Sequence, residues 1–253
     1  MIARITALVL LCAAASVAAQ ETATDEAKHS AAEARKRAIA AVPDPQAIFI
    51  AAKRADAAAK LPLLVYLHGK GSSPQRAVAG LRPLAESGVC SVLLCCGSDK
   101  LGMRADGACY GWAPQTDLDA ILAEIEKREG IDRGQVYLAG FSMGANMSYL
   151  AMLTRPGVFA GVIAFGGHLQ PEFIAAAAQG PAAKKPPVFI VHGRNDTVMP
   201  FALAGKAERW LLDHDYPVQV RPFDGGHKIP PGAVGLIEEA LTWFREQEAA
   251  RSR

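Results

Sequence analysis

The sequence predicts one α/β domain in which a mostly parallel sheet carries helices on both faces. From Leu61 onward, short apolar runs alternate with segments of helical spacing. Each run is continuous rather than alternating, as at 63–67 and 188–191, which is the pattern of strands buried on both faces. Of the 253 residues, 51% are hydrophobic, enough for one substantial core. We see no internal repeat and no low-complexity linker that would divide the domain.

Six apolar runs bounded by turn residues or helical segments are the expected strands: 63–67, 89–95, 135–139, 158–165, 188–191 and 218–223. Helical spacing predicts the helices, which are 74–87, 117–129, 143–153, 201–212 and 231–248. Within 117–129, for example, Leu118, Ile121 and Ile125 share one helical face. The remaining stretches, 97–112 and 168–186, are expected to be loops. Because both are short, we expect no large lid.

The first nineteen residues have the features of a signal peptide. Arg4 supplies a positive charge, residues 5–15 are uncharged and apolar, and residues 17–19 offer the small side chains that a signal peptidase needs. The apolar stretch is shorter than the ~18–20 residues that cross a membrane. A lipid anchor on Cys12 is disfavoured because Val-Leu-Leu precedes it. We therefore expect residues 1–19 to be removed, and a secreted or periplasmic protein with no stable membrane insertion.

Residues 20–60 are rich in alanine and charge, and we expect them to form a helical N-terminal arm. Helical spacing occurs at 31–41 and again at 48–59. The α/β domain then occupies 61–253. The formal net charge of +2 gives no basis for binding nucleic acid or an anionic membrane.

Four cysteines lie beyond the signal peptide: Cys90, Cys95, Cys96 and Cys109. An even number of clustered cysteines in an exported chain predicts disulfides, and all three pairings stay open. Zinc is the rival interpretation. No histidine lies near the cluster and its spacing matches no zinc finger or ribbon, so no metal is expected.

The strongest motif is Gly140-Phe141-Ser142-Met143-Gly144, which directly follows one expected strand and directly precedes an expected helix. This is the context of a nucleophile elbow, in which a serine occupies a strained turn and flanking glycines avoid collisions. The following helix directs its positive N-terminal end at the serine. Ser142 is therefore the expected nucleophile.

A serine hydroxyl needs a base to take its proton, and His227 is the expected base. It follows strand 218–223 through a loop that can carry an imidazole over the sheet edge toward Ser142. His192 is expected to shape its own loop instead, and His168 is the weaker candidate for a base.

Asp196 is expected to be the acid that orients His227. It lies just past strand 188–191, where a buried carboxylate can accept the imidazole Nδ1–H and stabilise the imidazolium. The alternative role for Asp196 is an N-cap of the next helix. Asp224 is the rival acid, but we expect it to be exposed.

A developing oxyanion needs two backbone N–H donors. One is expected from Met143, the residue after the nucleophile. The other is expected from Lys70 or Gly69, in the glycine-containing loop that follows strand 63–67. The side chain of Lys70 either adds positive charge near the site or is solvated.

Together these motifs resemble the phospholipase/carboxylesterase branch of the α/β-hydrolases, with some likeness to secreted polyhydroxybutyrate-depolymerase-like and feruloyl-esterase-like enzymes. The matching pieces, spread over about residues 61–246, are Leu67-His68-Gly69, Gly140-Phe141-Ser142-Met143-Gly144, His192-Gly193 through Asp196 to Val198-Met199-Pro200, and Gly225-Gly226-His227. The resemblance implies an α/β-hydrolase fold, no cofactor, and Ser142, Asp196 and His227 as a catalytic triad.

The resemblance also implies the reaction, which is cleavage of a small or polymeric carboxylic ester, or less often a thioester, through an acyl-enzyme. Met143 stands where cytoplasmic acyl-thioesterase members usually carry Gln, and this weakens the thioester alternative. Trp112 and His168 are candidates for substrate binding because they border the two loop stretches. The rival functions are a serine peptidase on the same fold and a non-catalytic envelope binding protein.

Overall fold

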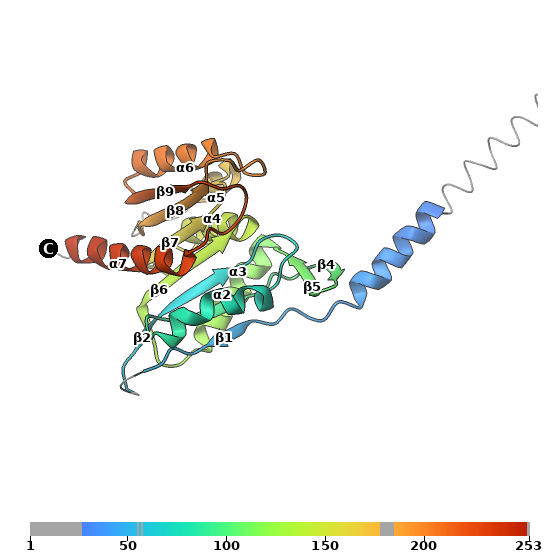
Figure 1. Ribbon diagram of the computed structural model, residues 1–253, viewed down its shortest axis with the longest axis horizontal. Coiled ribbons are helices and arrows are strands. Elements are labelled where there is room, and N and C mark those ends of the chain that lie inside the picture. Colours follow the sequence, from blue (N-terminus) through green and yellow to red (C-terminus); the bar gives the residue numbers. More distant parts are fainter. Residues whose placement is uncertain (1–26, 55, 57, 178–184, 252–253) are drawn as a thin grey trace, which may run out of the picture.

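The computed structural model describes residues 27–54, 56, 58–177 and 185–251, and the predicted signal peptide lies outside them. Residues 27–40 form a helix that projects away from the α/β domain (Figure 1). This part of the expected N-terminal arm is therefore helical. None of the helices in the described ranges is long and apolar enough to cross a membrane.

A seven-stranded sheet forms the centre of the domain, in the order β1-β3-β2-β6-β7-β8-β9 (Figure 1). Its strands are β1 (Ile48–Ile50), β2 (Leu61–Leu67), β3 (Ser91–Cys95), β6 (Ile131–Phe141), β7 (Gly161–Phe165), β8 (Val188–Gly193) and β9 (Val218–Phe223). All neighbouring strands are parallel except β1, which runs antiparallel to β3. The predicted mostly parallel sheet is confirmed.

Helices cover both faces of the sheet, as predicted. One face carries α2 (Pro74–Glu86) and α7 (Ala233–Arg251), and the other carries α3 (Pro114–Glu126), α4 (Met143–Thr154) and α6 (Ala202–Asp213). The short helix α5 (Pro171–Ala177) packs beside α4. No large lid is present in the described part of the chain.

Strand β2 shows why the apolar runs are continuous. Leu63, Val65 and Leu67 belong to the core under α3, α4 and α6. Leu64 and Tyr66 belong to the opposite core, under α2 and α7. Because successive side chains of a strand point to opposite faces, a strand covered on both sides has to be apolar throughout.

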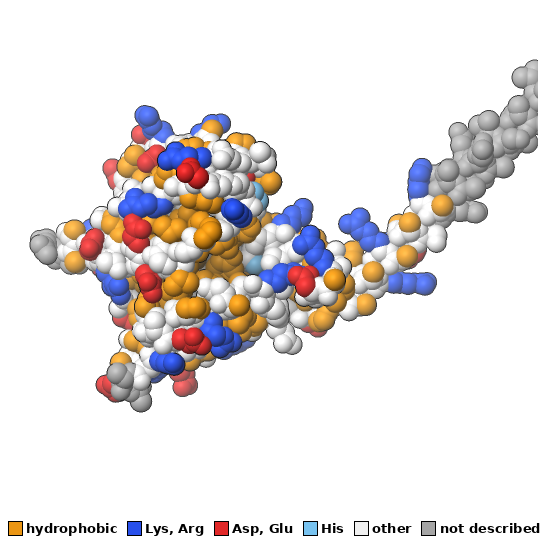
Figure 2. Space-filling model, viewed as in Figure 1, with side chains coloured by type: hydrophobic (Ala, Val, Ile, Leu, Met, Phe, Trp, Pro, Cys, Tyr) orange, Lys and Arg blue, Asp and Glu red, His pale blue; other side chains and the backbone are white. Residues whose placement is uncertain are grey.

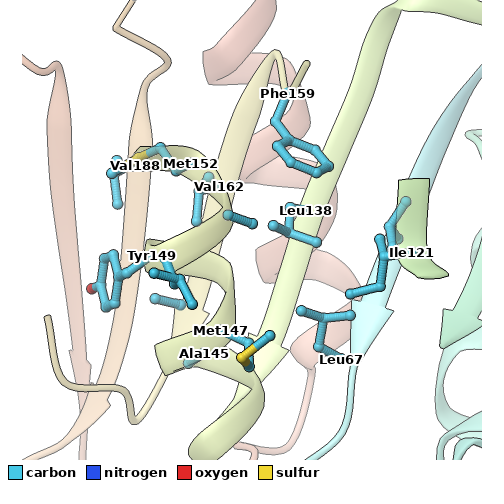
Figure 3. Packing of buried hydrophobic residues seen from close by; sticks show 14 of the residues in the cluster. Leu67, Ile121, Leu138, Ala145, Met147, Tyr149, Met152, Phe159, Val162 and Val188 are labelled. Atoms are coloured by element: carbon cyan, nitrogen blue, oxygen red, sulfur yellow. The ribbon is translucent and has the colours of Figure 1, made fainter. Parts of the chain in front are cut away.

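The larger core surrounds α4 (Figure 3). Figure 3 shows Met152 of this helix near Val162 and Val188 of neighbouring strands, within the same core. The helix is buried from Gly144 to Leu153, as expected of a helix that is apolar on all sides. This packing holds the start of α4, and with it Ser142, rigidly against the sheet.

The prediction of a helix over 48–59 was wrong. Ile48–Ile50 form the edge strand β1, in register with Leu94, Leu93 and Val92 of β3. β-branched and aromatic side chains fit the pleated surface of a sheet. Pairing with β3 therefore favours a strand here, although the neighbouring alanines have helical spacing.

The two stretches expected to be loops contain regular structure. The first holds a separate hairpin of β4 (Asp99–Arg104) and β5 (Gly107–Gly111), and the second holds α5. Glycines at 102 and 107 adopt positive φ values of 129° and 119°. Glycines normally weaken a strand pattern, so the sequence did not reveal this hairpin.

The disulfides predicted among the four cysteines are not formed, since all four are free. Cys90 lies in the core under α2 and α7, whereas Cys95 lies in the core on the opposite face of the sheet. Cys109 lies on the hairpin, where its sulfur is 3.8 Å from Nη2 of Arg76. The clustering in sequence therefore does not bring the thiols together in space.

Burial of these thiols predicts a loss of stability in alkali. Burial raises the pKa of Cys90 and of Cys96 from 9.0 to about 12, and it also raises the pKa of Cys95. Above pH 9 the unfolded chain loses thiol protons that the native chain retains. The free energy of unfolding should therefore fall as pH rises from 9, by at most about 1.4 kcal/mol per pH unit for each thiol.

Urea titrations between about pH 7 and 11 measure this slope. The Cys90→Ala variant is the matched comparison and should show a shallower decline. A free energy of unfolding that stays constant over the range would contradict the prediction.

Candidate active site

The predicted chemical groups meet at the carboxyl ends of the parallel strands. Ser142 follows β6, Asp196 follows β8 and His227 follows β9, while Gly69 and Lys70 follow β2. Sheets of this kind bind their ligands beyond this edge. Residues up to about 160 positions apart in the sequence therefore come together at one place because strand order puts their loops side by side.

Ser142 occupies a strained turn, as the elbow motif predicts. Its φ of 54° and ψ of −117° are unusual for a residue that carries a side chain. A Cβ on Gly140 would lie 2.3 Å from the backbone of Gly144, and a Cβ on Gly144 would lie 2.0 Å from the carbonyl oxygen of Leu67. A side chain at either position would collide with backbone atoms that cannot easily move, so both positions require glycine.

This steric requirement predicts a large cost for Gly144→Ala. The new methyl group would collide with the backbone of β2, and overpacking of this kind destabilises by about 3 kcal/mol. Chemical denaturation measures the change. Gly205→Ala is the matched control, because a Cβ there meets nothing within 4 Å on α6; it should stabilise by about 0.5–1 kcal/mol. Equal stability of the two variants would contradict this account of the elbow.

The three side chains of the predicted triad form one line of hydrogen bonds. His227 Nε2 is 2.8 Å from Ser142 Oγ, and His227 Nδ1 is 2.7 Å from Asp196 Oδ2. Ser142 is 9% exposed and Asp196 is 6% exposed. The imidazole thus connects a hydroxyl at the surface of a pocket with a buried carboxylate.

Asp196 is held as an anion. Burial opposes ionisation, but N–H groups of Met199 and Val198 donate to Oδ1 at 2.8 and 2.9 Å, and His227 donates to Oδ2. The donors outweigh burial, so the pKa of Asp196 lies below its ordinary value. The alternative role as an N-cap of α6 is not observed, since no side-chain cap bond is present there. Asp224 is exposed and lies 3.6 Å from Arg194.

Two other histidines support loops rather than the serine. His192 is fully buried, and its Nε2 is 2.6 Å from the carbonyl oxygen of Met199, which agrees with the predicted loop-shaping role. His68 donates from Nδ1 to the carbonyl oxygen of Gly69, and its Nε2 accepts the N–H of Gly97. Burial lowers the pKa of His68, so the neutral imidazole that makes both bonds is favoured.

A pocket of about 410 Å³ opens beside Ser142. Its lining residues are Gly69, Lys70, Phe141, Ser142, Met143, Asn146, Val198, Met199 and His227. The predicted oxyanion donors therefore lie on the wall of this pocket. Within the described residues, no hydrogen bond engages the backbone N–H of Lys70 or of Met143, so both donors are available.

The orientation of the Lys70 N–H follows from its peptide plane. The carbonyl oxygen of Gly69 belongs to the same plane. It accepts hydrogen bonds from the backbone N–H of Ser72, at 3.1 Å, and from Nδ1–H of His68, at 2.8 Å. The C=O and N–H of a trans peptide point in opposite directions. With the carbonyl turned into the loop, the Lys70 N–H points out of it.

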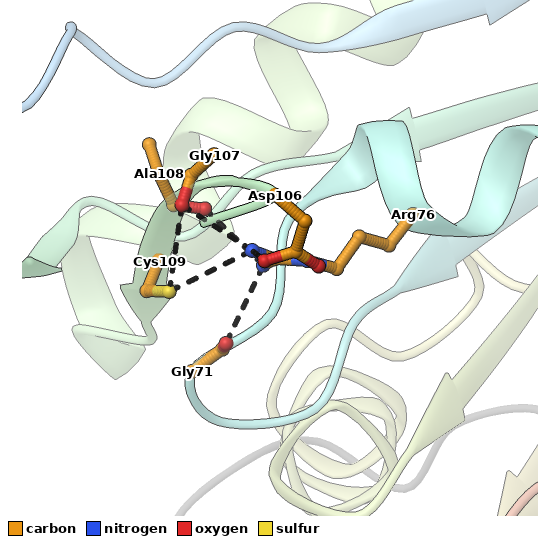
Figure 4. Close-up of polar contacts among 6 residues, drawn as sticks. All are labelled: Gly71, Arg76, Asp106, Gly107, Ala108 and Cys109. Atoms are coloured by element: carbon orange, nitrogen blue, oxygen red, sulfur yellow. Dashed lines mark hydrogen bonds and ion pairs between the residues drawn. The ribbon is translucent and has the colours of Figure 1, made fainter. Parts of the chain in front are cut away.

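The β4–β5 hairpin fixes this loop in place. Arg76 forms a bidentate ion pair with Asp106 and also contacts the carbonyl oxygens of Gly71 and Ala108 (Figure 4). The N–H of Gly71 donates to the carbonyl oxygen of Tyr110 at 2.8 Å. The hairpin and the loop after β2 are therefore one hydrogen-bonded unit.

The two predicted substrate-binding residues do not line the pocket beside Ser142. Trp112 is buried, and its Nε1–H donates to the carbonyl oxygen of His68 at 2.8 Å, so it supports the loop after β2. The backbone N–H of His168 donates to Asn146 Oδ1 at 2.7 Å.

Several pocket residues were missed in the sequence. Asn146 is a buried polar residue one turn after Ser142 in a mostly apolar helix, and that contrast was a usable signal. Val198 and Met199 follow Asp196, and their role in the pocket depends on a loop shape that the sequence does not reveal.

Comparison with known proteins agrees with this geometry. A family model described as Phospholipase/Carboxylesterase matches residues 113–243. Acyl-protein thioesterase 1 of Neurospora crassa is 29% identical over 127 residues, which are 49% of this chain and 51% of that protein. The chain thus spans about half the length of this relative. The bifunctional acetylxylan esterase/xylanase of Neocallimastix patriciarum is 34% identical over 146 residues, or 54% of this chain and 20% of that protein.

Solved structures show the same fold. Esterase PE8 superposes with a TM-score of 0.64 at 26% identity, covering 81% of this chain and 99% of that one. The Bacillus cereus carboxylesterase superposes with a TM-score of 0.55 at 21% identity, covering 80% of this chain and 94% of that one. The family model covers more than half of the sequence, and the chain belongs to the phospholipase/carboxylesterase family of α/β-hydrolases.

Proposed function

We propose that this chain is an exported serine hydrolase that cleaves carboxylic esters through an acyl-enzyme. The observation that carries the proposal is the continuous hydrogen-bond line from Ser142 Oγ through His227 to Asp196. Family membership and the esterase PE8 structure support the same reaction class.

The geometry supports a two-step mechanism. Ser142 Oγ attacks the ester carbonyl carbon while His227 Nε2 takes the hydroxyl proton, and the carbonyl oxygen becomes an oxyanion. The N–H groups of Met143 and Lys70 stabilise that oxyanion, and the N-terminal end of α4 adds a favourable dipole. When the intermediate collapses, the bond to the alcohol oxygen breaks and His227 returns the proton to the leaving alcohol.

Water completes the cycle. His227 accepts a proton from water, the hydroxide oxygen bonds to the acyl carbon, and the second intermediate collapses with release of the acid and reprotonation of Ser142. Throughout, Asp196 keeps the imidazole in the tautomer whose Nε2 is free to accept a proton. The buried N–H donors to Asp196 hold that carboxylate charged for this role.

Covalent labelling tests the proposal. A fluorophosphonate should add once per chain, and peptide mass spectrometry should place the adduct on Ser142. The labelled protein should lose hydrolysis of p-nitrophenyl acetate in proportion to the fraction labelled. An adduct on another serine, or full esterase activity in fully labelled protein, would refute the assigned nucleophile. No labelling and no hydrolysis would favour a non-catalytic binding protein.

A thioester is the second substrate class, because the relatives include an acyl-protein thioesterase. The same attack and proton transfers cleave a thioester. Comparing kcat/KM for an ester and a thioester with the same acyl group decides between them. We expect the ester to be preferred, and a large preference for the thioester would reverse the assignment.

Export rests on residues 1–19, whose charge and apolar pattern match a signal peptide. Expression of the full chain in a bacterium with a periplasm should yield mature protein that begins at Gln20. N-terminal sequencing of the periplasmic fraction provides the measurement. Uncleaved protein confined to the cytoplasm would contradict export.

A further inference from the structure

The pocket beside Ser142 contains one uncharged polar side chain that takes no part in the proposed mechanism. Among the described residues that line the pocket, Ser142 and His227 carry out the reaction and Lys70 carries a charge. Asn146 is the remaining polar side chain in a wall that is otherwise apolar. The pocket adjoins a largely apolar hollow between α2 and α7, which shares part of its wall (Figure 2). An amide in such surroundings needs hydrogen-bond partners.

Asn146 lies one helical turn after the nucleophile. Its backbone N–H donates to the carbonyl oxygen of Ser142 at 3.0 Å, which closes the first turn of α4. Side chains four residues apart share one face of a helix, and each Cβ tilts toward the N-terminal end of the helix. Because four residues rise by only about 6 Å, the Asn146 amide lies close to the place where an ester carbonyl meets Ser142.

One hydrogen bond fixes the orientation of the Asn146 amide. The backbone N–H of His168 donates to Oδ1 at 2.7 Å, and only the oxygen of an amide side chain can accept it. Nδ2 therefore points away from His168. Within the described residues Nδ2 has no hydrogen bond, and it is not sealed in the interior. Because Asn146 is only 6% exposed and lines the pocket, the unpaired N–H groups open into the pocket.

The oxygen of the same amide has a structural task. The loop after β7, which contains Gly166 and His168, passes close to the triad. A Cβ on Gly166 would lie 3.5 Å from Asp196 Oδ2 and from His227 Nδ1. Oδ1 of Asn146 holds this loop against α4. The two ends of the amide therefore have separate roles, and a substitution that keeps only one end distinguishes them.

We propose that Nδ2 of Asn146 donates a hydrogen bond to an acceptor oxygen that the ester carries close to its scissile carbonyl, so that Asn146 selects esters of oxygen-bearing acids or alcohols. The proposal rests on the proposed function and adds a specificity-determining residue. A purely aliphatic ester displaces water from the donor and leaves it unpaired in the pocket. An ether, hydroxyl or carbonyl oxygen of the substrate replaces that water as the acceptor.

Three pairs of esters measure this preference, and in each pair an ether oxygen takes the place of one methylene. For the acid, p-nitrophenyl methoxyacetate is paired with the butanoate, and p-nitrophenyl 3-methoxypropanoate is paired with the pentanoate. For the alcohol, 2-methoxyethyl acetate is paired with butyl acetate. The selectivity is the ratio of kcat/KM for the ether to kcat/KM for the alkyl ester. Comparison of this ratio between protein variants cancels the intrinsic reactivity of the esters.

Two variants separate the roles of the amide. Asn146→Leu removes both of its ends at nearly constant volume. Asn146→Asp keeps an oxygen for the N–H of His168 but replaces the donor with a second carboxylate oxygen. In at least one pair of esters, both variants should lower the ratio about fivefold, which is the discrimination expected of one neutral hydrogen bond. The pair that responds shows whether the acid or the alcohol carries the recognised oxygen.

Ser148→Ala is the matched control because it removes a buried polar group from the same helix without altering the pocket. The hydroxyl of Ser148 donates to the carbonyl oxygen of Gly144 at 2.9 Å, and Ser148 does not line the pocket. This variant should keep the wild-type ratio in every pair. Far-ultraviolet circular dichroism establishes that each variant is folded.

The proposal is overturned if either folded Asn146 variant keeps the wild-type ratio in every pair. A loss in Asn146→Leu alone would mean that Asn146 acts only by holding the loop after β7. An equal loss in Ser148→Ala would trace the effect to the helix and would also overturn the proposal. Failure of the proposed function gives a different result, namely no hydrolysis of any ester by wild-type protein and no labelling of Ser142.

Discussion

Replacing Ser142 with alanine is expected to lower kcat for p-nitrophenyl acetate by about 10⁶-fold, because the acyl-enzyme can no longer form. The residual rate should still exceed the rate in water, since the N–H groups of Met143 and Lys70 remain in place. KM should change little, and far-ultraviolet circular dichroism should be unchanged. Steady-state kinetics with purified protein measures the loss.

Ser87→Ala is the control for this variant. Ser87 is the C-cap residue of α2 and donates from Oγ to the carbonyl oxygen of Leu84 at 3.2 Å, so the variant removes an exposed serine hydroxyl outside the pocket beside Ser142. It should retain full activity. Equal rates in wild-type protein and Ser142→Ala would eliminate the nucleophile assignment, whatever the control shows.

Asp196→Asn is expected to lower kcat by about 10⁴-fold through a change of tautomer. Two backbone N–H groups, of Val198 and Met199, point at Oδ1, so the amide oxygen of the asparagine should occupy that position. Its NH₂ group would then face His227 Nδ1. The imidazole would carry its proton on Nε2, where it can no longer accept one from Ser142.

Asp224→Asn is the matched control because it makes the same chemical change on the loop that carries His227. The Asp224 side chain is exposed, and its ion-pair distance to Arg194 is 3.6 Å. The variant should keep wild-type kcat. A large loss in Asp224→Asn combined with normal activity in Asp196→Asn would make Asp224 the acid. The kcat values of both variants under the same conditions decide the matter.

Asp196→Asn should also change how the free energy of unfolding depends on pH. Because the pKa of Asp196 is below its ordinary value in the folded state, the ionised carboxylate stabilises the native protein above the pKa of the unfolded chain. This contribution is lost as pH falls through the lower, native pKa. The stability difference between wild type and Asp196→Asn should therefore shrink in strong acid.

Much of the fold was predictable because its signals are local. The strand 63–67 is apolar at every position since both of its faces are covered, and Leu63 and Leu64 do enter opposite cores. The elbow was also readable, because Gly140 and Gly144 are required by contacts within a few residues of Ser142 and with the adjoining strand. The expected strand before Ser142 and the expected helix after it supplied the context that identifies a nucleophile elbow.

Other features depend on partners that are distant in the sequence. Ile48–Ile50 form a strand because they pair with the free edge of β3. The sequence around residues 48–50 gives no indication that such an edge is available. The hairpin at 99–111 acquires its role from Arg76 and Gly71, which belong to a different segment. Cys90 and Cys95 cannot pair because they lie an odd number of positions apart, at and just before β3, and so enter the cores on opposite faces of the sheet.

The sequence by itself predicted six strands and five helices in their order along the chain, the strained turn at Ser142, and Ser142, Asp196 and His227 as candidate catalytic residues. The strands, the helices and the turn depend on short-range periodicity or on local steric requirements. Only the tertiary structure decided that Ser142, His227 and Asp196 lie within hydrogen-bonding distance, that Trp112 supports a loop, and that a pocket opens beside Ser142. Those facts depend on how the strands order themselves in the sheet, and strand order is set by contacts between residues far apart in the chain.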